Sequence, residues 1–227
     1  MPSLGMMSER LVMADPESAR DVLTFAGRAA RAGEDGVRLQ AAGGTLVMTA
    51  AALSPKGLLD RTPTVLAMRM LHADPELECD FVVSSLEQDA DPGSLVLPDE
   101  AISPAWAGIA PPRGGWAHTG EIDASTLANR AQWGIAAVAH QVPDNPGEDA
   151  VRAVRGSVWG QPDEDLQGLP LGVAFAAFTF GFISGGERAQ VFTAGRWTRV
   201  SLRRGHVLSR GPAVSGLTAV RATGTAA

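Results

Sequence analysis

The sequence predicts an α+β protein built from two related units, each of which runs strand, helix, hairpin, strand. Short stretches with alternating apolar and polar residues, typical of half-buried strands, are interspersed with segments whose apolar residues recur at helical spacing. The same order of elements occurs in both halves of the 227-residue chain. Between the halves, Asp89 to Pro112 is rich in Pro, Gly, Asp and Ser, which is the composition of a connector.

The first unit, predicted at residues 8–88, begins with a short strand and a helix with clear start signals. Asp15 offers a side-chain oxygen to free amides, Pro16 presets the first turn, and Glu17 favours the positive helix end. Gly33 is expected to end this helix. Alternation then predicts strands at four stretches: residues 36–41, 45–50, 64–71 and 79–84.

The connector is placed at residues 89–115 and holds one short strand, residues 94–97. The second unit, residues 116–210, is expected to have a strand at 117–122, followed by a helix that Asp123 caps. Alternation predicts three closing strands: residues 189–193, 197–202 and 206–209. Residues 211–227 have no periodic pattern and are expected to form a disordered tail.

An insertion of two helices is predicted within the second unit, at residues 145–186. Asn145 is expected to cap the first of these helices. The second is a buried helix at residues 169–183, because this run is apolar on every side and has no face for solvent. The run is shorter than the roughly 20 apolar residues needed to span a bilayer, so a core position is favoured over a membrane.

The two hairpins can be aligned without a gap. The segment RLQAAGGTLVMTA, from Arg38, lies over QVFTAGRWTRVSL, from Gln190, so that Ala42-Gly43 falls on Ala194-Gly195. We interpret this match as an internal repeat, with an accidental correspondence between two ordinary hairpins as the alternative. If the repeat is real, the apolar helix fills space against the two sheets.

Composition narrows the classes of function. A formal net charge of −6 argues against a general binder of nucleic acid or anionic membranes. The single Cys79 excludes an intramolecular disulfide, and no export signal is evident at the amino terminus, so a cytoplasmic location is expected. Phosphate-binding loops, dinucleotide fingerprints, nucleophile elbows and paired histidine ligands do not occur, so neither a cofactor nor a metal site is expected.

Two clusters are candidate binding sites. In the first, a loop with glycines and Arg113 could hold an anion, although a semi-rigid linker pinned by its tryptophans is favoured. Strand alternation is expected to put His118 on the face opposite Glu121. In the second, arginines beside an indole on the terminal hairpins could hold phosphates, although a solvated charge run that protects the sheet edge is favoured. The candidate binding residues are Trp106, Arg113, Trp116, His118, Arg196 and Trp197.

Two resemblances extend the prediction. The segment WAGIAPPRGGW at Trp106 to Trp116 and the segment GRW at Gly195 to Trp197 resemble an uncharacterised actinobacterial protein family, which implies no established activity. The repeated strand, helix and three-strand unit is similar to the architecture of DNA sliding clamps over residues 8–210. Clamps present basic helix faces to DNA, and three arginines lie on one side of the first helix: Arg20, Arg28 and Arg31. A solvated helix face is the alternative, and the inserted helices have no counterpart in clamps.

The resulting hypothesis is a non-catalytic, cytoplasmic binding or interaction protein that self-associates through exposed tryptophans and a long sheet edge. Its partner is expected to be itself or another protein, with no membrane and no cofactor. One alternative is a clamp-like, nucleic-acid-associated protein that uses its arginine faces. The other is an enzyme or small-molecule binder with a pocket at the Trp106 to Trp116 loop.

Overall fold

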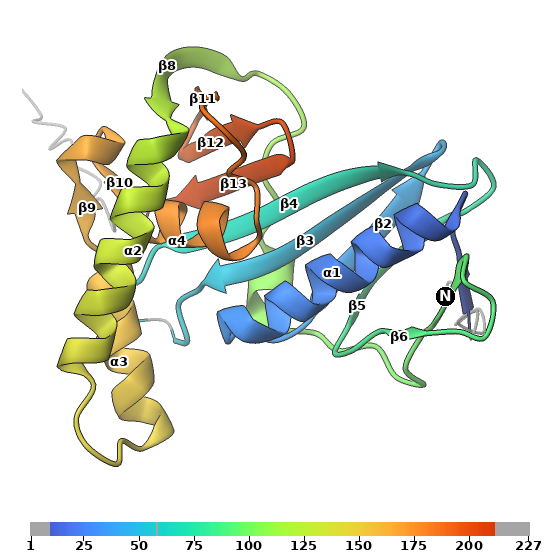
Figure 1. The fold of residues 1–227 in the computed structure, drawn as a ribbon, viewed down its shortest axis with the longest axis horizontal. Coiled ribbons are helices and arrows are strands. Elements are labelled where there is room, and N and C mark those ends of the chain that lie inside the picture. Colours follow the sequence, from blue (N-terminus) through green and yellow to red (C-terminus); the bar gives the residue numbers. More distant parts are fainter. Residues whose placement is uncertain (1–9, 58, 212–227) are drawn as a thin grey trace, which may run out of the picture.

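One antiparallel sheet of eight strands organises the computed structural model, which describes residues 10–57 and 59–211 (Figure 1). The strands follow one another in the order β5-β2-β3-β4-β13-β12-β11-β8. Each half of the chain contributes four neighbouring strands, and the pairing of β4 with β13 joins the halves. The bounds are β2 Val37–Ala42, β3 Thr45–Leu53, β4 Thr64–His72, β5 Cys79–Val83, β8 Ala117–Asp123, β11 Arg188–Ala194, β12 Trp197–Leu202 and β13 Gly205–Arg210.

Four α-helices and several short elements complete the described chain. The α-helices are α1 Pro16–Ala32, α2 Ala124–Gln141, α3 Glu148–Trp159 and α4 Gly172–Thr179. A small sheet has the order β1-β7-β6, with bounds Arg10–Val12, Ser94–Val96 and Glu87–Gln88. The other short elements are the strand pair β9 Pro162–Asp163 and β10 Leu169–Pro170, and the 3₁₀ turns η1 Ala105–Gly108 and η2 Glu164–Leu166. These elements confirm the predicted α+β class with two inserted helices.

The two hairpins have the same register, as the alignment predicted. Leu39 pairs with Met48 in the first hairpin, and the aligned Val191 pairs with Val200 in the second. Both turns contain a glycine at positive φ, Gly43 at 56° and Gly195 at 57°, a conformation that only glycine adopts cheaply. The two units are therefore related in structure as well as in the order of their elements.

The start and end of helix α1 agree with the predicted capping residues. Asp15 Oδ1 accepts hydrogen bonds from the backbone amides of Glu17 and Ser18, each at 2.8 Å. Pro16 occupies the first helical position, and Gly33 ends the helix with a left-handed φ of 81°. Capping of this kind satisfies amides that have no partner within the helix.

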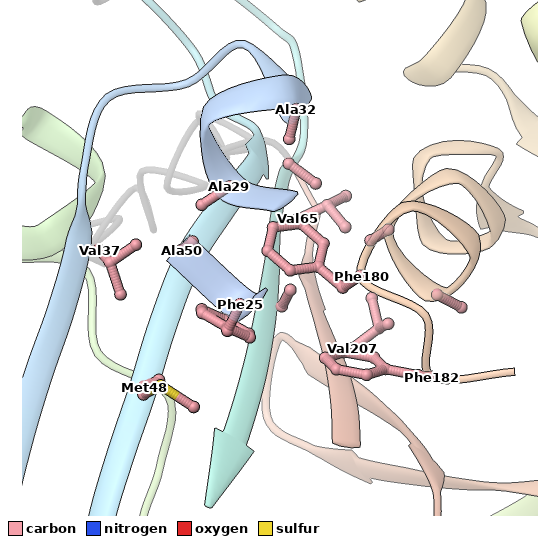
Figure 2. Close-up of a cluster of buried hydrophobic side chains, with 14 of the residues drawn as sticks. Phe25, Ala29, Ala32, Val37, Met48, Ala50, Val65, Phe180, Phe182 and Val207 are labelled. Carbon is pink, nitrogen blue, oxygen red and sulfur yellow. The ribbon is translucent and has the colours of Figure 1, made fainter. Parts of the chain in front are cut away.

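One face of the sheet, which we call the first face, packs against the helices and carries the main core (Figure 2). Phe25 of α1 meets Phe180, which follows α4, with a ring-centroid separation of 5.0 Å. Beneath them lie Met48 of β3 and Val207 of β13, both fully buried. Burial of such side chains is the dominant stabilising term in folding, so this face holds the two halves together.

The opposite face, which we call the second face, is covered by the connector instead of by helices. Trp106 is 3% exposed, and its Nε1 donates a hydrogen bond to the Asp35 carbonyl at 2.9 Å. It shares a smaller apolar cluster with Ala51, Leu66 and other residues of the second face. The connector is therefore pinned to the sheet by an indole, as the linker interpretation predicted.

The apolar helix is buried as predicted but is shorter than residues 169–183. Leu169 and Pro170 form β10, which pairs with Pro162–Asp163, so helix α4 covers only Gly172–Thr179. After Phe180, Gly181 adopts a φ of 67°, which ends the helical path. Apolar composition alone therefore predicted the burial of this segment but not the extent of its helix.

Two expected helix caps are wrong. Asp123 precedes α2, but its carboxylate makes no cap and instead lies 3.1 Å from Arg188 Nε. Asn145 has a φ of 52°, and α3 begins later, at Glu148, with Gly147 at the cap position. An ion pair across neighbouring strands competes with capping in the first case. All but the first residue of the predicted tail, residues 211–227, lies outside the described residues.

Candidate functional site

Three of the predicted site residues meet on the second face. Trp106 and Trp197 belong to one buried cluster, and the partly buried Trp116 packs against it. The expectation that these tryptophans are exposed is wrong for two of them, because Trp106 is 3% and Trp197 is 7% exposed. Their large apolar rings fill the space between the connector and the sheet. The polar side chains around them are therefore the groups available to a partner.

Arg199 is the most unusual of these side chains. Its guanidinium lies between two aromatic rings, 4.6 Å from the Trp116 centroid and 4.7 Å from that of Phe192. No carboxylate of the described residues pairs with it, and its buried Nε has no hydrogen-bond partner. Burial lowers the pKa of Arg199, although arginine remains charged near neutral pH. The rings orient the guanidinium while its charge stays unbalanced.

Two more arginines of the described residues have no carboxylate partner, one against Trp197 and the other three residues before Trp116 in the sequence. Arg210 of β13 lies over the Trp197 ring, 6.0 Å from its centroid, and the exposed Arg113 belongs to the connector. Arg196, at the β11–β12 turn, donates a hydrogen bond to the Gly211 carbonyl at 3.2 Å. We call the following set the arginine–tryptophan surface: Arg113, Trp116, Phe192, Trp197, Arg199 and Arg210.

The sixth predicted site residue, His118, does not lie opposite Glu121. The pairing of β8 with β11 shifts register, so that His118 faces Phe192 while Gly120 faces Val191. This bulge puts one extra residue between them and brings His118 and Glu121 to the same face. Gln190 connects them, with His118 Nε2 at 2.9 Å from Gln190 Oε1 and Gln190 Nε2 donating to Glu121 Oε1 at 3.0 Å.

Hydrogen bonds and burial set the charge states of Glu121 and His206. Hydrogen bonds from Gln190 and Arg188 lower the pKa of Glu121. His206 of β13 lies 3.0 Å from Ser201 Oγ through its Nδ1. Burial, with a smaller effect from the Arg199 charge, lowers the pKa of His206. Near neutral pH the carboxylate is therefore charged and His206 is neutral.

Charge is strongly segregated along the chain. The arginines of the terminal hairpins were predicted as a cluster, but the acidic stretch was missed because the net charge conceals it. Residues 188–210 contain six arginines and no acidic residue. Residues 70–112 contain nine acidic residues and no lysine or arginine. Counting charges in windows would have found the acidic stretch as well. We call the exposed acidic residues between Asp74 and Glu100, apart from Asp80, which pairs with Arg38, the acidic segment: Asp74, Glu76, Glu78, Glu87, Asp91, Asp99 and Glu100.

Both outer strands of the sheet are partly blocked. At β5, the Ile102 amide donates a hydrogen bond to the Val82 carbonyl at 2.9 Å. At β8, Gln167 Nε2 donates to the Glu121 carbonyl at 2.8 Å. Interruptions of this kind discourage edge-to-edge pairing of sheets. The long open edge expected from the sequence is thus shorter than the strands themselves.

The arginines of helix α1 do not form one free face. Arg28 Nη1 donates a hydrogen bond to the Phe180 carbonyl at 2.5 Å, and the guanidinium is partly buried. Arg20 and Arg31 are exposed. Arg28 therefore links α1 to the end of α4 and is not available to a ligand in the way the clamp resemblance implied.

The three best-formed cavities in the described structure lie away from the predicted loop site. None of them is lined by Trp106, Arg113 or Trp116. Within residues 10–57 and 59–211, no group of three or more His, Cys, Asp or Glu side chains is arranged to hold a metal ion. None of the helices described is both long and apolar enough to cross a membrane.

The chain matches two protein-family models. Residues 6–108 match a domain of unknown function, DUF8010, and residues 111–214 match a second domain of unknown function, DUF8185. Each model matches just under half of the chain. DUF8010 carries the acidic segment and β2 to β5, while DUF8185 carries the arginine–tryptophan surface and the other four strands of the sheet.

No curated protein matches the chain. Similar solved structures include Caulobacter crescentus pol III beta, at 12% identity and a TM-score of 0.46, with 91% of this chain and 66% of that chain covered. A DnaN sliding clamp (DNA polymerase III subunit beta) from Bartonella birtlesii bound to griselimycin has 12% identity and a TM-score of 0.48, with 92% and 66% covered. The chain thus spans about two thirds of the length of these clamps. At these scores the likeness carries no argument about function.

Proposed function

We propose that this chain is a non-catalytic interaction protein that binds a second copy of itself. The arginine–tryptophan surface of one copy contacts the acidic segment of the other. The observation that carries the proposal is Arg199, whose guanidinium is stacked between Trp116 and Phe192 and has no carboxylate partner among the described residues.

An unpaired, partly buried arginine destabilises the folded state. Burial of an unsatisfied polar group costs free energy, and the stacked rings recover only part of that cost. A partner carboxylate would satisfy the guanidinium through paired hydrogen bonds. Arginine and tryptophan are also the residues most enriched among those that dominate binding energy at protein interfaces.

The acidic segment supplies the complementary charge within the same chain. Glu76 and Glu78 lie between β4 and β5, and Asp99 and Glu100 lie in the connector, all of them exposed. Complementary patches of this kind steer association and fix its orientation. Because both sheet edges are partly blocked, contact between a face and a loop segment is favoured over strand addition.

The test is the molar mass in solution, measured by light scattering at low and at high salt. We expect wild-type protein to exceed its monomer mass of 23.6 kDa at low salt and to dissociate as salt screens the charges. The double variant Arg113→Glu/Arg210→Glu is expected to be monomeric. Arg20→Glu, which reverses an exposed arginine of α1, is the matched control and should behave as wild type. A wild-type monomer at low salt and high protein concentration would exclude the proposal.

A nucleic acid is the second candidate partner, because arginines beside an indole can bind phosphates. Fluorescence anisotropy with a labelled oligothymidine distinguishes the two readings. Self-association predicts no tight binding at physiological salt. Binding that is lost in Arg113→Glu/Arg210→Glu would place nucleic acid on this surface. Binding lost in Arg20→Glu would instead support the helix face that the clamp resemblance implied.

A further inference from the structure

We infer that the cleft between α3 and the first half of the chain binds a small zwitterion of the amino-acid class. The cleft has a volume of about 760 Å³, within the range of ligand-binding sites. It is lined by α3 on one side and by the ends of α1 and β3 on the other. It shares no residue with the arginine–tryptophan surface, so the inference is independent of the proposed self-association.

A largely buried carboxylate lines the cleft. The Glu34 side chain is 9% exposed, and its Oε2 accepts hydrogen bonds from Ser54 Oγ at 2.7 Å and Lys56 Nζ at 2.5 Å. Its Oε1 has no hydrogen bond from a described residue. Lys56 is the only lysine of the chain, and this arrangement holds it against Glu34 in a cleft lined by both charge types.

Two cationic side chains of the lining, Lys56 and Arg155, keep donors that a ligand could use. Lys56 retains two further N–H groups beyond its bond to Glu34. Arg155 of α3 donates to the Ala32 carbonyl and lies over the Phe175 ring at 5.2 Å, which leaves most of its N–H groups unused. The remaining N–H groups of Lys56 and Arg155 would bind a ligand carboxylate through charge-assisted hydrogen bonds.

The lining also offers acceptors for a cation. Asp60 accepts the backbone amides of Lys56 and Thr62, each at 2.9 Å, and keeps lone pairs for a further donor. Glu148 is an exposed residue of the same lining, while Arg152 and Asp149 pair with each other at 2.9 Å. Cationic donors and carboxylate acceptors in one cleft match a molecule with a carboxylate and an ammonium group, and Leu53 and Val151 add apolar lining.

The test uses L-norleucine and two molecules that each lack one of its charges. Hexanoate lacks the ammonium group, and pentylamine lacks the carboxylate. By isothermal titration calorimetry we expect norleucine to bind and each half-charged molecule to bind at least about ten-fold more weakly, because each loses one charge-assisted contact. Hexanoate that binds as well as norleucine would overturn the zwitterion class, and no binding of norleucine would overturn the site.

The single lysine allows a second readout on the unmodified wild-type chain. An N-hydroxysuccinimide acetyl ester acetylates Lys56 and the chain's amino terminus, and mass spectrometry follows each rate. Norleucine should slow acetylation of Lys56 several-fold and leave the amino-terminal rate unchanged. Equal rates with and without norleucine would contradict binding in this cleft. Among variants, Lys56→Met should lose calorimetric binding, while Arg61→Met, in the same loop but outside the lining, should keep it.

Discussion

The two faces of the sheet differ in the polarity of the side chains at their central positions. On the first face, β-strand positions such as Leu39, Met48 and Val207 are apolar and fully buried beneath helices. On the second face, central strand positions include the polar residues Arg199 and His206, and Arg199 is stacked between the Trp116 and Phe192 rings. The apolar residues of the first face are explained by their contribution to stability. The second face holds polar groups at partly buried positions, which stability does not require, and residues of this kind are expected at functional sites.

The largest difference between the faces should appear in their response to truncation. Phe180 is fully buried on the first face, between Phe25 and Phe182. We expect Phe180→Ala to lower the free energy of unfolding by about 3–5 kcal/mol, because a large cavity would remain. Urea denaturation followed by circular dichroism measures this loss. A loss below about 1 kcal/mol would mean that the first face is not the main core.

At the second face, replacement of a charged side chain is expected to leave stability nearly unchanged or to raise it. Arg199→Leu keeps a side chain between Trp116 and Phe192 but removes a buried donor that has no partner. We expect stability within about 1 kcal/mol of wild type, or above it, because buried unsatisfied groups are costly. The same variant should lose self-association in light scattering. A strongly destabilised Arg199→Leu would show that the arginine has a structural role instead.

A smaller, pH-dependent effect is expected at His206. Burial lowers the pKa of His206 below its usual 6.5, so the unfolded chain binds this proton at a higher pH than the folded chain does. Stability should therefore fall as the pH decreases through 6.5 toward the lower folded pKa. His206→Gln should reduce that fall. Urea midpoints compared at pH 8 and pH 5 check the prediction, and identical pH dependence in both proteins would refute it.

Features that depend on local sequence were predicted well. The start of α1 was predicted because Asp15, Pro16 and Glu17 act within one turn of helix. The hairpin repeat was predicted because alternation and turn glycines are encoded within about a dozen residues. The buried character of α4 followed from its composition, although its bounds did not.

Features that depend on distant contacts were not predictable in the same way. The position of the bulge in β8 depends on how β8 pairs with β11. Alternation within β8 alone therefore predicted the wrong face for His118. The stack of Arg199 on Trp116 joins strand β12 to the residue that follows the connector, and no periodicity encodes that contact. The Glu34 and Lys56 pair is likewise formed only when the ends of α1 and β3 meet. Of the candidate residues, Trp106, Trp116 and Trp197 converge in the fold. The stacking of Arg199 between two aromatic rings was not predicted.

The most direct measurement mixes two charge-reversed proteins, Arg113→Glu/Arg210→Glu and Glu76→Lys/Glu78→Lys, each of which carries one intact patch. Light scattering at low salt should find each variant monomeric alone, because its two patches then repel. The equimolar mixture should form a heterodimer, because the intact acidic segment of one variant meets the intact arginine–tryptophan surface of the other. A mixture that stays monomeric, or variants that self-associate as wild type does, would contradict the account.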